Sequence, residues 1–416
     1  MPPDVSVVIP TYNRAELLRR TLTALAAQRM PAERFEVIVA DDGSGDHTRD
    51  VVRDFAGVLR MEYHFQNDLG FRAGAARNAG ARLATAPVLV FADTGVLAGP
   101  DFLDAHLGAH RGRSGPARAV VGYTYGYRVD NPTPGLDVAA ATMTPEEIVR
   151  SYDGSPALWD MRHPAYLVYG FDLRRSLLPW QFFWSVNCSV PAADFHAAGG
   201  FDEDFRSWGG EDLELGFRLF RRGLEFQIGY EAWAVDTPHP RATTADIDTN
   251  RGNILTFLYK HPEPIVELLW AWFMREQPWF GQNHDWYVET EYPRLSRAAA
   301  ASRTVDVTGE LAALRELPAG TRVAVLGCGG QLPGGVEPAA LIDFDRQRLR
   351  ELPAALSHSV HHAVGIRTVL PDDAVDLVFI TSRLAPLWPR WGPLILAEAR
   401  RIGRAVRGPL VAAEPG

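Results

Sequence analysis

Two acidic residues follow two glycines in the stretch FRSWGGEDLELGFR, residues 205–218. The apolar periodicity after Glu211 and Asp212 predicts an amphipathic helix that begins at these acids. A helix N-terminus stabilises an ionised carboxylate, and such a carboxylate can take a proton from a hydroxyl within hydrogen-bond reach. Gly209 and Gly210 let the backbone approach a substrate closely. The stretch therefore indicates a general base at the start of a helix, although acids in a first helical turn are also favoured by the dipole alone.

Groups suited to a nucleotide follow the first two predicted strands. PTYNR, residues 10–14, comes after the first strand, and DDGS, residues 41–44, comes after the second. Tyr12 can stack on a base, and Asp41 or Asp42 can accept a hydrogen bond from a base N–H or a ribose hydroxyl. The alternative for DDGS is a turn and a helix cap, because Asp, Gly and Ser are common there for backbone reasons. The sequence leaves both interpretations open.

Charged groups follow in the next helix and strand. In GFRAGAARNAG, residues 70–80, Arg72 and Arg77 offer forked donors that suit phosphate, and Gly80 permits close packing. A solvated helix residue is the alternative for Arg77. In VLVFADTG, Asp93 follows a strand, and one carboxylate can hold a divalent metal ion when substrate phosphates complete the shell. A lone Asp at such a place is also typical of a turn.

These residues need a sheet to bring them together. Strand and helix patterns alternate in the first hundred residues, which indicates a doubly wound α/β sheet. Ligands of such sheets bind outside the carboxyl ends of the strands. The predicted strands span residues 5–10, 35–40, 61–64 and 88–92, and the predicted helices span 14–28, 48–55 and 74–84.

In this order, VSVVIPTYNR, VIVADDGS, GFRAGAARNAG and VLVFADTG resemble the nucleotide-binding half of the family-two glycosyltransferases of the GT-A fold. The resemblance covers residues 5–99 and implies a mixed, Rossmann-like sheet that binds a nucleotide sugar, with a UDP-sugar expected. That family holds a divalent metal ion, Mn2+ or Mg2+, on an Asp-x-Asp motif after the fourth strand. Phe91 stands at the first position of that motif here, so only Asp93 remains. The residues expected to hold the nucleotide are Pro10, Thr11, Tyr12, Arg14, Asp42 and Arg77.

A second resemblance covers residues 184–239. AAGGFDEDFRSWGGEDLELGFRL resembles the acceptor-side motif shared by galactosyltransferase-type enzymes and the chondroitin-polymerase type of GT-A domain. It implies that Asp212 is the catalytic base and that Glu211 helps to shape the site. A histidine completes the metal shell in that family, and His239 in VDTPHP is the candidate, although a histidine before proline is also typical of a loop. The residues expected to line the acceptor and donor-sugar pocket are Trp184, Trp208, Gly209 and Gly210, with Trp180 as a further candidate.

The C-terminal third has its own α/β pattern. VAVLGCGG, LIDFD, DLVFI and PLVAAE predict strands, and residues 321–416 resemble the first part of a class I methyltransferase-like Rossmann domain. The resemblance implies that Gly327, Gly329 and Asp343 or Asp345 hold S-adenosylmethionine. The first-strand motif lacks the usual acid, and the pattern stops near the fourth or fifth strand. We therefore expect a non-catalytic accessory domain.

Composition agrees with a globular protein of several domains. The chain has 416 residues, 46% hydrophobic residues and a net charge of −9, which disfavours non-specific binding to nucleic acid. Cys188 and Cys328 form neither a disulfide framework nor a zinc pattern. The most apolar later run, residues 265–274, contains Glu267 and is too short to span a bilayer. We expect a cytoplasmic protein with no transmembrane segment, and the sequence leaves homo-oligomerisation open.

The combined prediction is an inverting, metal-dependent glycosyltransferase. It would move a hexose or N-acetylhexosamine from a nucleotide sugar to an acceptor on a glycan, a natural product or a peptide. Two alternatives stay open: a catalytically degenerate GT-A scaffold that binds nucleotide sugars, and a bifunctional protein whose C-terminal domain binds S-adenosylmethionine. The predicted parts are a GT-A domain at 1–245, a helical, aromatic-rich extension at 246–303 and a truncated Rossmann domain at 304–416.

Overall fold

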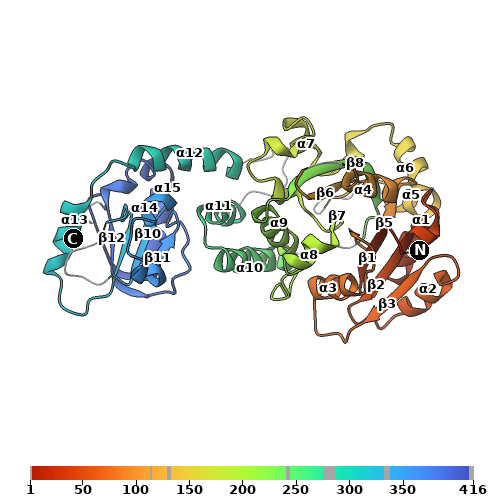
Figure 1. The fold of residues 1–416 in the computed structure, drawn as a ribbon, viewed down its shortest axis with the longest axis horizontal. Helices are drawn as coiled ribbons and strands as arrows, with labels where there is room; N and C mark the ends of the chain where they lie inside the picture. The colour runs from red at the N-terminus through yellow and green to blue at the C-terminus, as the bar shows by residue number, and fades with distance from the viewer. Residues whose placement is uncertain are drawn as a thin grey trace. The chain divides into compact units, whose positions relative to one another are not determined.

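The computed structural model describes residues 2–112, 115–128, 133–239, 244–274, 287–331 and 338–411. These residues form two compact units, one that extends to Asn253 and one that begins at Ile254. Each unit has a sheet of its own, and Figure 1 colours the first sheet red to green and the second cyan to blue.

The first unit is built on an eight-stranded sheet in the order β3-β2-β1-β4-β7-β6-β8-β5. β3, β2, β1 and β4 are parallel, β7 is antiparallel to both β4 and β6, and β5 is antiparallel to β8 at the far edge. The strands are β1 (Val5–Thr11), β2 (Phe35–Asp41), β3 (Met61–Phe65), β4 (Val88–Ala92), β5 (Val96–Ala98), β6 (Arg118–Tyr125), β7 (Asn187–Pro191) and β8 (Glu225–Asp236).

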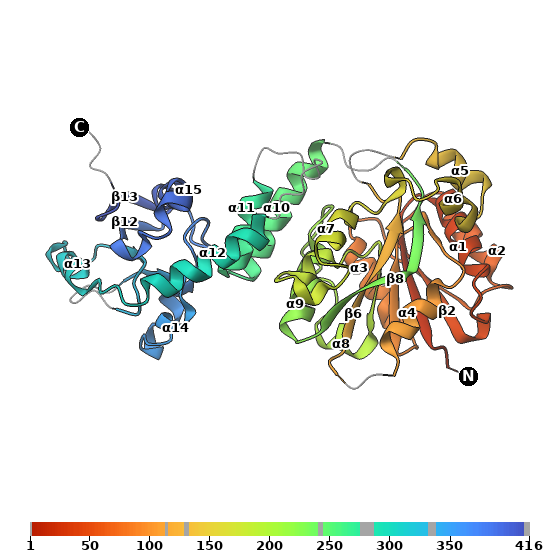
Figure 2. The same ribbon diagram turned by 90° about the horizontal axis from the view of Figure 1, so that it is seen from above.

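Helices cover both faces of this sheet because its central strands are apolar on both sides. Val7 and Ile9 of β1 face the core that includes α1 (Ala15–Ala26) and α2 (Thr48–Phe55). On the opposite face, α3 (Ala73–Leu83) packs so closely that a Cβ at Gly80 would lie 2.6 Å from Val8 Cγ1. Figure 2 shows α1 and α2 on one side of the sheet and α3 on the other. The predicted role of Gly80 in close packing is confirmed.

The first hundred residues form the predicted strands and helices, with ends that differ by up to two residues. Beyond them, a loop-rich segment connects β6 to β7 and contains only short helices. The remaining helices of this unit, with the 3-10 turns marked η, are η1 (Ala32–Arg34), α4 (Phe102–His110), α5 (Leu136–Thr142), α6 (Pro145–Ser151), η2 (Pro156–Leu158), α7 (His163–Val168), η3 (Leu173–Arg175), η4 (Pro179–Phe182), α8 (Ala192–Ala197) and α9 (Glu211–Arg221). α10 (Thr244–Lys260) crosses the boundary at Asn253.

The second unit contains a parallel five-stranded sheet in the order β11-β10-β9-β12-β13. Its strands are β9 (Val323–Leu326), β10 (Ala340–Asp343), β11 (Val360–His362), β12 (Val375–Ile380) and β13 (Gly403–Arg407). Its helices are α11 (Pro264–Phe273), α12 (Tyr287–Ser302), α13 (Thr308–Ala312), η5 (Ala313–Glu316), α14 (Arg346–Leu349), η6 (Ala354–Ser359), η7 (Ser382–Leu384) and α15 (Trp388–Ile402). The predicted fold class, a mixed doubly wound sheet followed by helices and a smaller α/β sheet, is confirmed.

One predicted strand is wrong. PLVAAE was predicted as the last strand, but its described residues, 409–411, form a turn, and the rest lie outside the described ranges. The strand is β13, a few residues earlier. β13 lies at the edge of the sheet and carries Arg404 and Arg407, so it lacks the apolar run that marks a central strand. Within the described ranges, no helix combines the length and apolarity that a bilayer span requires.

Candidate active site

The carboxyl ends of β1, β2 and β4 meet at one edge of the first sheet. Thr11 lies opposite Asp41 in the β1–β2 pair, and the N–H of Asp42 donates to the carbonyl of Thr11 over 2.9 Å. After β4, the hydroxyl of Thr94 donates to the carbonyl of Pro10 over 2.8 Å. The stretches PTYNR, DDGS and ADTG are therefore neighbours in space.

The structure separates the two acids of DDGS. Asp41 fixes the turn, since its Oδ1 accepts from the N–H groups of Gly43 at 3.0 Å and Ser44 at 2.7 Å. Its Oδ2 accepts from the hydroxyl of Tyr63 at 2.7 Å. The turn interpretation thus holds for Asp41.

Asp42 lies beneath the segment that connects β3 to α3. Its Oδ1 accepts from Nε2 of Gln66 at 2.6 Å, and its Oδ2 accepts from the backbone N–H of Arg72 at 2.8 Å. Gly43 has a φ of +97°, and a Cβ there would lie 2.4 Å from the backbone nitrogen of Asp68. Only glycine therefore fits between this segment and the turn.

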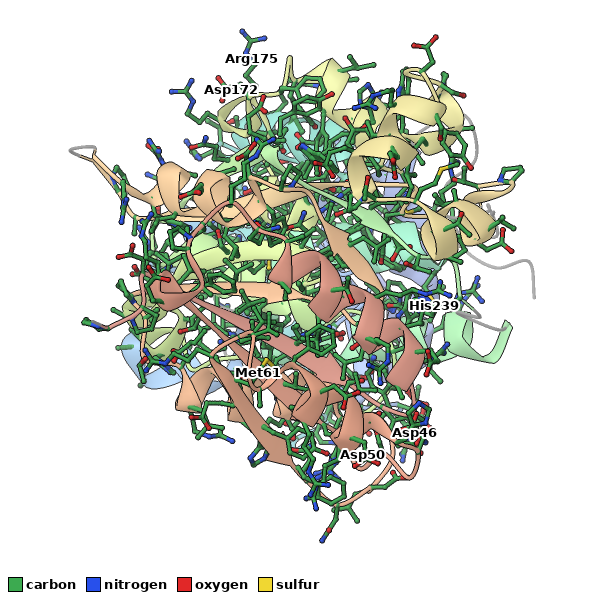
Figure 3. All side chains as sticks on the ribbon, turned by 90° about the vertical axis from the view of Figure 1, so that its right-hand side faces the viewer. Asp46, Asp50, Met61, Asp172, Arg175 and His239 are labelled. Atoms are coloured by element: carbon green, nitrogen blue, oxygen red, sulfur yellow. The ribbon has the colours of Figure 1, made fainter. Side chains whose placement is uncertain are left out.

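The loop after β1 is held by the loop after β2. Asn13, at a φ of +49°, donates its N–H to Ser44 Oγ over 2.8 Å, and its Oδ1 accepts from the N–H of Gly45 at 2.8 Å. Asp46, labelled in Figure 3, accepts from the N–H of Ala15 at 3.1 Å and so fixes the start of α1. These contacts fix the backbone around the predicted nucleotide residues.

Tyr12 and Arg14 flank Asn13. The side chain of Tyr12 is 45% exposed, and its hydroxyl donates to Asp68 Oδ2 over 2.8 Å. The ring is therefore accessible for stacking on a base. Arg14 directly precedes α1, at the N-cap position.

Arg77 links the end of β4 to the start of α9. Its side chain is 5% exposed. Its Nη2 donates to Asp93 Oδ1 over 2.8 Å, and its Nη1 donates to Glu211 Oε1 over 3.2 Å. Burial lowers the pKa of Arg77, but Asp93 and Glu211 outweigh it and raise the pKa above its usual range. Arg77 is therefore a buried cation between two carboxylates and not a solvated helix residue.

The two glycines before α9 both have positive φ angles, which glycine adopts readily. Gly209 and Gly210 have φ values of +93° and +89°. Asn253 of α10 donates its Nδ2 to the carbonyls of Ser207 at 3.0 Å and Gly209 at 2.7 Å. A Cβ at Gly209 would lie 2.5 Å from Asn250 Nδ2. Sequence analysis missed these asparagines, although polar residues on a helix with buried neighbours were an available signal.

Asp212 lies in the first turn of α9 with both oxygens bonded to backbone N–H groups. Its Oδ2 accepts from Ser185 at 3.2 Å, and its Oδ1 accepts from Leu213 at 2.8 Å. Burial and the neighbouring Glu211 raise the pKa of Asp212 to about 7, against the opposing effect of Arg77 and the two N–H donors. Glu211 Oε2 is buried and has no hydrogen-bond partner among the described residues.

The predicted aromatic residues have different environments. Trp184 and Trp208 are half-buried, and Nε1 of Trp184 donates to the carbonyl of Gln181 over 2.9 Å. Trp180 is fully buried, with its ring 5.3 Å from that of Phe217. The prediction of Trp180 as a pocket residue is wrong, because it belongs to the core beneath α9.

Asp93 and His239 come from neighbouring turns. The N–H of Thr237 donates to the carbonyl of Gly95 over 2.9 Å, and His239 Nδ1 lies 2.9 Å from the carbonyl oxygen of Thr237. A Cβ at Gly95 would lie 3.8 Å from that Nδ1. His239 is labelled in Figure 3. The structure therefore brings the turn after β4 and the end of β8 together.

Asp93 and His239 are the two side chains expected to bind a metal ion, and such an ion would also need ligands from the substrate. The side chain of Asp93 is 32% exposed. Phe91 is fully buried, with its ring 5.1 Å from Phe195 and 5.3 Å from Phe201. Across the described ranges there is no group of three or more His, Cys, Asp or Glu side chains that could hold a metal ion. One carboxylate and one imidazole fit an ion whose shell is completed by phosphates and water.

The glycine loop of the second unit packs against an arginine. Asp343 Oδ2 accepts from the N–H of Gly329 at 2.8 Å and from Nε of Arg383 at 2.9 Å. Arg383 is fully buried, and a Cβ at Gly329 would lie 2.9 Å from its Cδ. The acid predicted to hold a ribose therefore holds a guanidinium, a partner that sequence analysis missed.

Comparison with known proteins finds two family models that match the first unit. A family model described as glycosyl transferase family 2 matches residues 6–136, and one described as the N-terminal domain of galactosyltransferase matches residues 168–239. The validoxylamine A glucosyltransferase of Streptomyces hygroscopicus subsp. jinggangensis (strain 5008) is 45% identical over 98% of this chain and 97% of that protein. The chondroitin synthase of Escherichia coli is 31% identical over 54% of this chain and 33% of that protein.

Among solved structures, Staphylococcus aureus TarS 1–349 in complex with UDP-GlcNAc is similar at a TM-score of 0.47 and 14% sequence identity, over 97% of this chain and 91% of that one. The sequence similarity is decisive, because the relative at 45% identity spans nearly the whole of both chains. The chain therefore belongs to the family 2 glycosyltransferases.

Proposed function

We propose that the protein transfers a glucosyl group, with inversion, from UDP-glucose to a hydroxyl of validoxylamine A or a chemically similar acceptor. The glucosyl group and the acceptor are suggested by the name of a relative that is 45% identical over 98% of this chain, and UDP is the nucleotide expected from the sequence motifs. The observation that carries the chemistry is the ion-pair chain from Asp93 through Arg77 to Glu211, next to Asp212. It joins the strand end that faces the nucleotide to the helix that carries the base.

The nucleotide would lie across the ends of β1 and β2. Asp42 would accept a hydrogen bond from the base of the nucleotide, and the accessible ring of Tyr12 would stack on that base. Pro10, Thr11 and Arg14 would complete this side of the site. Arg77 would face the phosphates as predicted, with its charge already balanced by Asp93 and Glu211.

Asp212 would act as the general base. The acceptor hydroxyl attacks C1 of the glucosyl group, the bond between C1 and the diphosphate oxygen breaks, and the hydroxyl proton passes to Asp212. The nucleoside diphosphate leaves with the electron pair, on the face opposite the attack. Trp184, Trp208 and the backbone of Gly209 and Gly210 would line the sugar and acceptor positions.

Asp93 and His239 would hold a divalent metal ion together with the diphosphate. Such an ion supplies positive charge against the charge that develops on the leaving group. The chain's own part is to present one carboxylate that is 32% exposed, anchored by Arg77 at 2.8 Å.

Melting temperatures measured with UDP-glucose, UDP-GlcNAc and GDP-mannose, each with and without Mn2+, test the proposal. A ligand that binds only the folded protein raises the melting temperature. We expect the largest rise with UDP-glucose and Mn2+. Asp212→Asn should keep that rise and lower transfer to validoxylamine A by about 10²–10⁴-fold. No rise with any nucleotide sugar would contradict a transferase, and a rise without turnover in the native protein would favour the degenerate scaffold.

A further inference from the structure

The turn at residues 182–185 connects the acceptor side of the site to the base. Trp184 lies in this turn, and the N–H of the next residue, Ser185, donates to Asp212 Oδ2 over 3.2 Å. The position of this turn therefore determines both the position of the Trp184 ring and the orientation of the Asp212 carboxylate. Asp212 bonds the Ser185 end of this turn, and a second side chain bonds its Phe182 end.

Arg162, from the segment between β6 and β7, holds it. Nη1 of Arg162 donates to the carbonyl of Phe182 over 2.9 Å. The guanidinium carbon lies 4.8 Å from the centroid of the Trp184 ring, within the range of a cation–π contact. The side chain of Arg162 is 2% exposed, so these contacts are shielded from water.

Arg162 is in turn fixed by Asp160 and by β6. Nε donates to Asp160 Oδ1 over 3.0 Å, and Nη2 donates to Asp160 Oδ2 over 2.7 Å. Nη2 also donates to the carbonyl of Gly122 over 3.0 Å, and Asp160 Oδ2 accepts from the N–H of Thr124 at 2.9 Å. The guanidinium therefore ties the Trp184 turn to a central strand.

Stability alone is a poor reason for this arrangement. Asp160 is fully buried, and apolar residues of similar volume often stabilise a core as well as a buried ion pair does. An arginine does something that an apolar residue cannot, because its N–H groups bond a carbonyl and a carboxylate while its guanidinium carbon lies over an aromatic ring. Small displacements at an acceptor site reduce rates strongly, so a rigid support has a catalytic reason.

We propose that Arg162 is a positioning residue of the acceptor side, which holds the turn 182–185 so that Trp184 receives the acceptor and the Ser185 N–H orients Asp212. The proposal rests on the proposed function. The proposal predicts different effects on the two substrates. Binding of the acceptor depends on Arg162, whereas no described bond joins Arg162 to the residues of the donor side.

Arg162→Lys and Arg162→Met, made in the full chain, test this role. With UDP-glucose, Mn2+ and validoxylamine A, we expect both variants to raise the acceptor KM by about tenfold or more and to lower kcat. The donor KM should stay within about twofold, and the rise in melting temperature with UDP-glucose and Mn2+ should stay within about 1 °C. Lysine keeps the positive charge but not the forked donors, so both variants should raise the acceptor KM.

Arg401→Met is the matched control. Arg401 also pairs with a buried glutamate, Glu398, at 2.6 Å and donates to the carbonyl of Leu370 over 2.7 Å, but it belongs to the second unit. It should lower stability without changing the ratio of acceptor to donor KM.

Equal changes in both KM values, or an unchanged acceptor KM, would overturn the role of Arg162, and if Arg162→Met does not fold, the constants of Arg162→Lys decide. A native protein that shows no rise with any nucleotide sugar overturns the proposed function and this role together.

Discussion

At the scale of single residues, three acids lie close to one buried arginine, Arg77. Asp93, Glu211 and Asp212 are acids, and Arg77 is the described cation bonded to the first two of them. Asp212 therefore has its charge opposed by burial and by Glu211, which together raise its pKa to about 7. A base with such a pKa changes its protonation state within the range in which enzymes are assayed.

The pH dependence of the rate follows from this position. Asp212 accepts a proton only when it is ionised, so the rate of transfer should rise with pH through about 7 and level off above it. In Glu211→Gln the neighbouring negative charge is gone, ionisation of Asp212 becomes easier, and the midpoint should move down by about 1 pH unit. Initial rates measured from pH 5.5 to 9 check both statements. A midpoint that moves upward in Glu211→Gln would contradict this account of the carboxylate pair.

The sequence could name these residues but not their partners. Asp212 and Asp93 stand next to glycines and strand ends that mark a site, so their types and spacing are informative. Arg77 and Glu211 are 134 positions apart, and no local sequence pattern predicts their contact. The same holds for Asp41 and Asp42, which the sequence could not separate because the turn geometry, and not the residue type, assigns their roles.

At the scale of elements, Glu267 shows why a charged residue stands in an apolar helix. It is buried in α11, and its Oε1 accepts from the backbone N–H groups of Gly365 and Ile366 at 3.0 Å and Arg367 at 3.1 Å. Its Oε2 accepts from the N–H of Val364. The carboxylate thus accepts hydrogen bonds from the backbone N–H groups of the loop after β11 and joins α11 to the second sheet.

Glu267→Gln should destabilise the second unit. The amide NH2 would face the N–H of Val364 or of its neighbours, which leaves a buried donor without an acceptor at a cost of about 2 kcal/mol. We expect the melting temperature of the full chain to fall by about 5 °C. Glu263→Gln is the control, because the side chain of Glu263 is 22% exposed and its ion pair with Arg346 is longer, at 3.4 Å. Equal melting temperatures for the two variants would show that the four N–H groups do not need the carboxylate.

Strands that are buried on both faces were predictable from their apolar composition. β1, β2 and β4 carry continuous apolar runs because both faces are covered. β13 lies at an edge of the sheet, and its two arginines interrupt the apolar run by which a strand is predicted. The segment that carries Asp160 and Arg162 has no periodicity over more than one short helix, and its role depends on a buried ion pair that no pattern reveals.

At the scale of the whole molecule, the chain combines two units, each with its own sheet. In the second unit, the crevice at the carboxyl ends of β9 and β10 is where a Rossmann-like sheet would bind a cofactor. Arg383 fills that position, since it is fully buried and bonds Asp343 at 2.9 Å. Ser302, at the end of α12, donates its hydroxyl to the carbonyl of Arg383 over 3.0 Å and so closes the same side.

The native protein should therefore fail to bind S-adenosylmethionine. A cofactor ribose would have to displace Arg383 from Asp343, which would leave a buried guanidinium and a buried carboxylate without their partner, at a cost of about 3–5 kcal/mol. Titration calorimetry with S-adenosylmethionine should show no heat of binding, and the melting temperature should not rise, while UDP-glucose with Mn2+ serves as the positive control in the same preparation. Binding of S-adenosylmethionine in the micromolar range would instead mean that the Arg383–Asp343 pair opens, and it would restore the bifunctional alternative.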